Sequence, residues 1–77
     1  MKKIFSTNDI VLAASLQLHK KNMIKIEKHG NRGVFVFENI EDDFLNNYDL
    51  GKIVVEPVGF SSTVKQLTIS VKRVMER

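Results

Sequence analysis

The chain contains no cysteine, so no disulfide can stabilise it. This absence is typical of proteins from a reducing compartment, and we expect a cytoplasmic protein. The chain also lacks a long hydrophobic run. The longest, residues 10–18, is interrupted by Ser15 and Gln17 and falls well short of the roughly 18 residues that a membrane span needs. The basic start at residues 1–3 is not followed by a small-residue cleavage site, which predicts a native start rather than a signal peptide.

What remains is an ordinary globular composition. The chain has 77 residues, of which 43% are hydrophobic and 27% are charged. This length suits a single domain, 1–77, and the composition is not that of a disordered chain. Because a domain of this size buries only about 60% of its unfolded surface, we expect its stability to be modest.

The charge is distributed unevenly along the sequence. Residues 1–38 carry seven Lys or Arg and three acids, a net charge of +4. Residues 39–56 carry one Lys and five acids, a net charge of −4, and residues 57–77 carry four Lys or Arg and one acid, a net charge of +3. We therefore expect separate basic and acidic surfaces.

A first helix is predicted over about residues 7–19. Ser6 is a suitable N-cap, and the Asp9 carboxylate, three residues later, can reach back to the backbone N–H of the cap. Apolar residues cover nearly every face of this helix, which is typical of a helix buried against a sheet. Asn22 is the expected C-cap.

A β-hairpin is predicted over residues 23–37. Residues 23–28 alternate apolar and charged side chains, as in a strand with one wet face. Residues 29–33, HGNRG, are rich in residues that tolerate positive φ and suit a turn. Residues 34–37, VFVF, are apolar on both faces, which predicts the central strand of the sheet.

Two more helices and a short strand are predicted in the second half. Asn39 can cap a helix over 40–49, and a short strand follows at 53–55. Pro57 suits the first turn of a third helix, 57–75, because proline has no N–H to lose there. Spacings of four and three place one apolar stripe along this helix: Phe60, Val64, Leu67, Val71 and Val74.

These elements predict an α+β fold. Its sheet is small and mainly antiparallel, built from the hairpin 23–37 and the short strand 53–55, and it is packed with the three helices. Ile4 and Phe5 can add another short strand or a hydrophobic staple before the first helix.

The opening residues resemble a known family. Residues 5–16, FSTNDIVLAASL, are similar to the F-x-T-x-D-x-x-L-A-A-x-L opening of short bacterial and bacteriophage proteins catalogued as a domain of unknown function. Later elements of the resemblance are an F-x-F strand at 35–37, an acidic helix start at 41–43, a V-x-P turn at 55–57 and an amphipathic helix over 60–74. Asn22-Met23 departs from it, because a glycine is expected after the first helix. The resemblance implies this fold and a prophage or mobile-element setting, and it implies no activity.

No catalytic or cofactor motif is present. The sequence has no G-x-S-x-G, no glycine-rich phosphate loop and no H-E-x-x-H, so we expect neither an enzyme nor a cofactor. His19 and His29 with Glu27 form a conceivable metal site, but a solvated helix-end histidine and a loop histidine explain both residues more simply.

Three consecutive acids are the first candidate site. Glu41, Asp42 and Asp43 lie in the first turn of the second helix, where the helix dipole favours anions. We prefer this structural explanation to a divalent cation site, which would need alternating oxygen ligands. A third alternative is an acidic patch for a basic partner, for instance a second copy of the chain.

The basic residues are the second candidate site. Lys65 and Lys72 share one face of the last helix, and Arg32 occupies the hairpin loop. If the helix and hairpin surfaces are contiguous, they can follow a phosphate backbone, although no aromatic residue interleaves for base stacking. The residues proposed to contact nucleic acid or a partner are Lys25, Lys28, Arg32, Lys65, Lys72 and Arg73.

The leading hypothesis is a non-catalytic binding or regulatory module, associated with a phage or mobile element, that acts by binding another protein. The alternative is a small nucleic-acid-binding regulator that uses the 29–33 loop and the C-terminal helix. A homodimer formed through the apolar stripe of that helix is a further alternative.

Overall fold

A computed structural model of the chain describes residues 3–76 and confirms the α+β class. It contains three helices and one three-stranded antiparallel sheet. In chain order, the elements are β1 (Ile4–Thr7), α1 (Ile10–Leu18), β2 (Met23–His29), β3 (Arg32–Glu38), α2 (Asp42–Asp49) and α3 (Pro57–Met75). None of these helices is both long and apolar enough to cross a membrane.

β3 is the central strand, as its apolar sequence predicts. The strand order is β1-β3-β2, and both neighbours run antiparallel to β3. Phe37 lies opposite Phe5 of β1 and Met23 of β2, and Phe35 lies opposite Thr7 and Ile26. Side chains opposite one another share a face of the sheet, so these residues form one continuous inner face.

The prediction of a strand at 53–55 is wrong. These residues form neither a helix nor a strand, and the third strand of the sheet is β1 at the start of the chain. β1 and β2 occupy both sides of β3, and residues 53–55 pair with none of these three strands.

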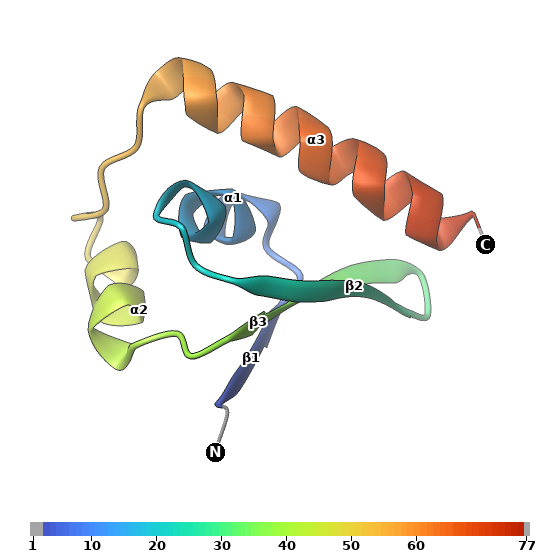
Figure 1. Cartoon of the computed structure of the whole chain (residues 1–77), viewed down its shortest axis with the longest axis horizontal. Coiled ribbons are helices and arrows are strands. Elements are labelled where there is room, and N and C mark those ends of the chain that lie inside the picture. The colour runs from blue at the N-terminus through green and yellow to red at the C-terminus, as the bar shows by residue number, and fades with distance from the viewer. Residues whose placement is uncertain (1–2, 77) are drawn as a thin grey trace.

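α1 and α3 cover the inner face of the sheet, with α1 lying beside α3 (Figure 1). Phe35 and Phe37 from β3 pack with Leu16 from α1 and Leu67 from α3, and each of these side chains is at most 3% exposed. α2 stands at one end of this two-layer core (Figure 1). The other face of the sheet is covered by no helix of the described chain.

α1 begins three residues later than predicted. Ser6 belongs to β1, where it lies opposite Val36, so it cannot cap a helix. Asp9 is the N-cap instead, and its Oδ1 accepts hydrogen bonds from the backbone N–H groups of Val11 at 2.9 Å and Leu12 at 3.3 Å. Because Ser6 pairs in the sheet, Asp9 replaces it as the N-cap of α1.

α1 ends in a Schellman motif, and the prediction that Asn22 is the C-cap is wrong. His19 is the C-cap, and the N–H groups of Lys20 and Lys21 donate to the carbonyls of Gln17 and Leu16, both at 2.9 Å. Lys20 adopts φ 61°, a left-handed conformation that the β-carbon disfavours. The glycine expected after this helix is thus replaced by a strained lysine.

Lys20→Gly should stabilise the fold by about 1 kcal/mol, because glycine adopts positive φ without a steric penalty. Urea unfolding followed by circular dichroism measures the gain. Lys21→Gly is the control: Lys21 does not adopt positive φ, so its replacement should destabilise the protein. Equal effects of the two substitutions would contradict the assignment of strain to Lys20.

α2 is shorter than the predicted 40–49. Asn39 adopts φ 58° rather than capping, and this turn directs Ile40 into the core, where it is 3% exposed. The helix then begins at Asp42 after Glu41, whose side chain makes no capping bond. α2 contains no buried residue, although Phe44, Leu45 and Tyr48 pack partly against the core. The Tyr48 hydroxyl also donates a hydrogen bond of 3.4 Å to Asp9 at the start of α1.

α3 has the predicted bounds, Pro57–Met75. The carboxylate of Glu56 caps it by accepting hydrogen bonds from the backbone N–H groups of Val58 and Gly59. These bonds, the one from Gly59 first, lower the pKa of Glu56 below its ordinary value of 4.5. The ionised carboxylate is therefore the form that the folded state prefers.

Glu56→Gln should make the protein less stable at neutral pH, and the difference should vanish in acid. A lowered folded-state pKa contributes stability above the unfolded pKa and loses it as the pH falls through the folded value. Thermal melts of both proteins from neutral pH to below 4.5 would show the two melting temperatures converging. Glu41→Gln is the matched control, because Glu41 precedes α2 without a side-chain capping bond, and its effect should be smaller.

Candidate functional site

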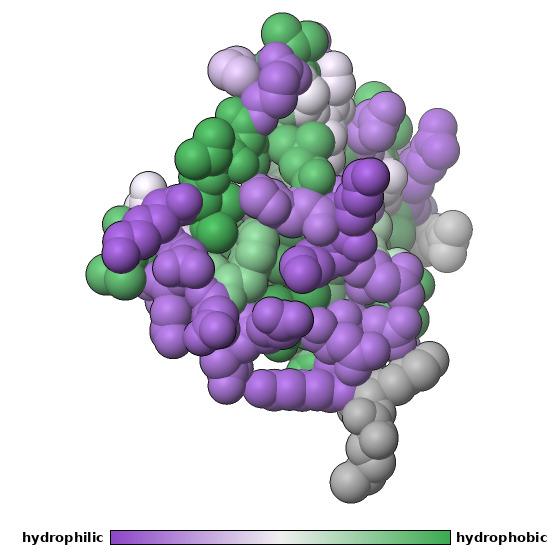
Figure 2. Space-filling model, turned by 60° about the vertical axis from the view of Figure 1, so that its left-hand side comes forward, coloured by the Kyte–Doolittle hydropathy of each residue, from purple (hydrophilic) through white to green (hydrophobic). Residues whose placement is uncertain are grey.

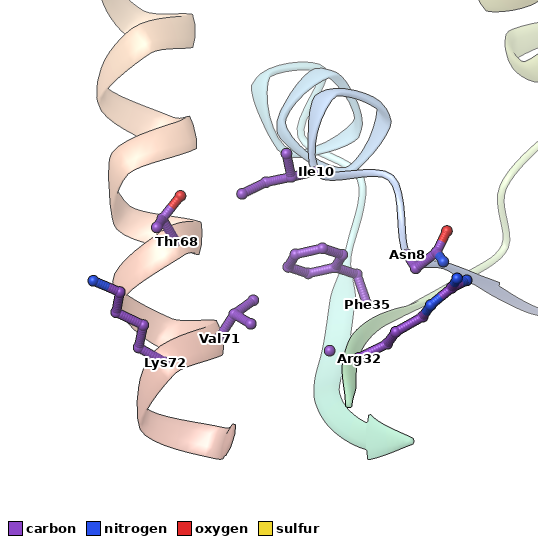
Figure 3. Close-up of a pocket in the computed structure, with 8 residues that line it drawn as sticks. Asn8, Ile10, Arg32, Phe35, Thr68, Val71 and Lys72 are labelled. Atoms are coloured by element: carbon purple, nitrogen blue, oxygen red, sulfur yellow. The ribbon is translucent and has the colours of Figure 1, made fainter. Parts of the chain in front are cut away.

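A cleft of about 390 Å³ lies where α3 extends past the start of α1. α3 has 19 residues and α1 only nine, so the C-terminal half of α3 continues over the hairpin without α1 beside it. Figure 3 shows α3 on one side, the first turn of α1 above and β3 below. The volume falls in the lower part of the range, roughly 300–1,000 Å³, of small-molecule sites.

The floor of the cleft is apolar. Ile10 from α1, Phe35 from β3 and Val71 from α3 point toward one another (Figure 3). Phe35 is only 2% exposed, whereas Ile10 and Val71 are half-buried. A ligand would therefore meet mainly the aliphatic side chains, and Phe35 is not available for base stacking.

The rim of the cleft is polar and cationic. Arg32 comes from β3, and its side chain extends toward Asn8 (Figure 3). Thr68 and Lys72 come from α3 on the opposite side, and the amino group of Lys72 points away from the apolar residues (Figure 3). Neither Arg32 nor Lys72 forms an ion pair with another described residue. None of the lining residues is acidic, so the cleft favours an anionic group next to an apolar one.

Gly33 sets the distance between the hairpin and α3. A β-carbon at this position would lie 2.7 Å from Cγ1 of Val71 and 3.3 Å from Cγ2. α3 can therefore pack on the hairpin only because residue 33 has no side chain. Both residues line the cleft.

The structure brings together two of the six predicted basic residues. Arg32 and Lys72 line the same cleft, although they are far apart in the sequence. Lys65 lies on the same face of α3 as Lys72, two turns away and outside the cleft. Lys28 and Arg73 do not line it either.

Lys25 is on the other face of the sheet. It lies opposite Val36, whose neighbours Phe35 and Phe37 face the helices. Its Nζ contacts Glu27 Oε2 at 2.9 Å, and the ring of His29 contacts Glu27 Oε1 at 3.2 Å. Hydrogen bonds from Lys25 and then His29 lower the pKa of Glu27. The basic residues therefore do not form one continuous surface.

The acidic patch is exposed and lies away from the cleft. Glu41, Asp42 and Asp43 are all exposed, and Lys3 Nζ contacts Asp42 Oδ1 at 3.1 Å. No group of three or more Asp, Glu or His among residues 3–76 is arranged to hold a metal ion. The first turn of a helix explains these acids without a ligand.

The two histidines have different surroundings, so the conceivable site of His19, His29 and Glu27 does not form. His19 Nε2 lies 3.0 Å from the carbonyl oxygen of Val54, and its ring packs edge-on against Phe44 at 5.2 Å. His29 lies at the hairpin turn, at the other end of β2. The contact with His19 holds Val54 next to the C-terminal end of α1.

Sequence reasoning named two of the eight residues that line the cleft as candidate site residues, Arg32 and Lys72, and missed the other six: Asn8, Ile10, Gly33, Phe35, Thr68 and Val71. Gly33 and Phe35 were assigned to the hairpin turn and the central strand. Ile10 and Val71 belong to apolar stripes that predict core positions, and Asn8 and Thr68 carry no motif. The unequal lengths of the first and third predicted helices were the only available signal, because a longer helix leaves part of its inner face uncovered.

Neither the known protein families, nor the curated proteins, nor the solved structures contain a match to this chain.

Proposed function

We propose that the protein is a non-catalytic binding module that holds a segment of another protein in the cleft. The observation that supports this function is a cleft with an apolar floor whose charged lining residues, Arg32 and Lys72, are both basic. A peptide with a carboxylate beside an apolar side chain matches both features, since the carboxylate can accept charge-assisted hydrogen bonds while the apolar group covers Ile10 and Val71. The association with a phage or mobile element rests on the sequence resemblance alone.

A peptide titration followed by NMR tests this proposal. Acetyl-Asp-Phe-Glu-amide should shift the backbone amide signals of Ile10, Gly33 and Thr68, and acetyl-Asn-Phe-Gln-amide should bind at least about tenfold more weakly, because its amides cannot form ion pairs with the rim. The double variant Arg32→Glu with Lys72→Glu should lose the same signal changes.

The control variant is Lys25→Glu with Lys28→Glu, which changes the net charge equally and leaves the cleft lining intact. It should bind the acidic peptide with reduced long-range attraction but with the same shifted residues. Equal loss of binding in both double variants would show that only net charge matters and would contradict a specific cleft.

Nucleic-acid binding is the second candidate, favoured by Lys65 and Lys72 on one helix face next to Arg32. The Lys25–Glu27 ion pair on the opposite face and the buried ring of Phe35 make it the weaker one. Lys65→Glu with Lys72→Glu should lower the salt slope of binding to duplex DNA by about two. Fluorescence anisotropy at several salt concentrations measures that slope, and an unchanged slope excludes the α3 face.

A further inference from the structure

Residues 52–56, KIVVE, connect α2 to α3 at the edge of the molecule and form neither a helix nor a strand (Figure 1). Ile53 and Val55 are half-buried, whereas Val54 is 81% exposed. This alternation, together with three β-branched residues in a row, is that of a strand with one face on the core. The segment thus has the sequence and exposure pattern of a strand but no strand partner.

The backbone of this segment is available for pairing. The N–H groups of Ile53, Val54 and Val55 donate to no acceptor within the described chain. The Val54 carbonyl accepts from His19 at 3.0 Å, so the polar edge of this residue faces α1. In a paired strand, successive residues direct their N–H and C=O groups to opposite edges, so those of Ile53 and Val55 would face away from α1.

The segment is complementary to itself. In an antiparallel pair centred on Val54, Ile53 of each copy lies opposite Val55 of the other, and Lys52 lies opposite Glu56. We propose that two copies of this chain associate about a two-fold axis at Val54, pairing their 52–56 segments as antiparallel strands. Ile53 and Val55 would supply the hydrogen-bonded pairs, and Val54 would form the close non-hydrogen-bonded pair.

Charge and exposed apolar surface both favour a second copy of the chain as the partner of residues 52–56. Opposite charges directly across an antiparallel pair are stabilising, and Lys52 has no ion pair within the described chain. Leu50, Val54 and Val58 are the most exposed large hydrophobic residues described, at 68%, 81% and 73%. All three lie on or beside the segment, and Figure 2, turned toward this side, shows hydrophobic side chains gathered above a hydrophilic band. Pairing about a two-fold axis would cover these exposed hydrophobic residues in both copies.

Sedimentation velocity of the full chain tests the dimer. The mass should rise from 8.8 kDa toward twice that value between micromolar and millimolar concentration. Val54→Lys should weaken the dimer at least about tenfold, because it places two ammonium groups opposite each other. Ile69→Lys is the matched control: Ile69 is 52% exposed on α3, outside the segment, so dimerisation should be unchanged.

Mixing two variants gives the decisive test. Val54→Lys and Val54→Glu should each remain monomeric alone and should form a heterodimer together, since their charges are then opposite. Circular dichroism should show that both variants fold, as expected for a side chain that is 81% exposed. A monomeric wild type at millimolar concentration, a dimer unaffected by Val54→Lys, or a mixture that stays monomeric would each overturn the proposal.

Discussion

Phe37→Ala should destabilise the protein by about 3–5 kcal/mol, the usual cost of removing a buried phenylalanine. Phe37 is fully buried in the central strand and lies opposite Phe5 and Met23, so its ring fills the space between both neighbouring strands and the helices. Small domains have a total stability of roughly 5 kcal/mol or slightly more. Most of the folded population should therefore be lost near physiological temperature.

Urea unfolding followed by far-ultraviolet circular dichroism measures this loss, which suits a chain without tryptophan. Phe44→Ala is the matched control, because Phe44 is only half-buried on the peripheral helix α2. Its replacement should cost clearly less than that of Phe37. Similar costs for the two variants would show that α2 belongs to the core and that the described layering is wrong.

Gly33→Ala should cost about 1–3 kcal/mol through overpacking. The new methyl group would lie 2.7 Å from Cγ1 of Val71, and the β-branched valine cannot move aside without rotating against its own helix. α3 must therefore shift away from the hairpin. Because Gly33 and Val71 both line the cleft, the substitution should also disturb peptide binding there.

A double-mutant cycle assigns the cost to this one contact. Val71→Ala removes both methyl groups that collide with the new side chain and leaves only its own Cβ, at an ordinary 3.6 Å. Gly33→Ala should then cost much less in the Val71→Ala background than in the wild type. Additivity of the two substitutions within about 0.5 kcal/mol would show that the strain arises elsewhere.

Local sequence signals predicted α3 and β3 well because packing and propensity agree there. The stripe of α3 repeats over about four turns. Pro57 follows a carboxylate that can cap, so the start of α3 is fixed locally. Residues 34–37 are apolar on both faces, and the structure places them in the centre of the sheet. Such consistency across several signals is what makes an element predictable.

The remaining errors arise from long-range competition. Residues 53–55 have a stronger strand pattern than residues 4–7, yet β1 is the strand that pairs with β3. Ser6 has the right spacing for a capping box, but it belongs to β1 and pairs with Val36, so it does not cap the helix. Neither outcome follows from local propensity, because strand partners are chosen by tertiary packing.

The cleft was predictable only in part. Its charge is visible in the sequence, and Arg32 and Lys72 were among the basic candidates. That these two residues line the same cleft, while Lys25 faces the other side of the sheet, depends on the register of β2 and β3 and on the overhang of α3. Register and helix overhang are properties of the assembled fold.

The pairing order of the sheet also has a consequence for folding. β2 and β3 are neighbours along the chain, so their hairpin can form within microseconds. β1 must instead pair with β3 across the whole of α1 and β2, and α1 meets its helical neighbour only when α3 arrives from the far end of the fold. Until that slower, non-local step, apolar side chains of α1 that α3 later covers remain exposed to solvent. We therefore expect the partly folded chain to be most prone to aggregation at this stage.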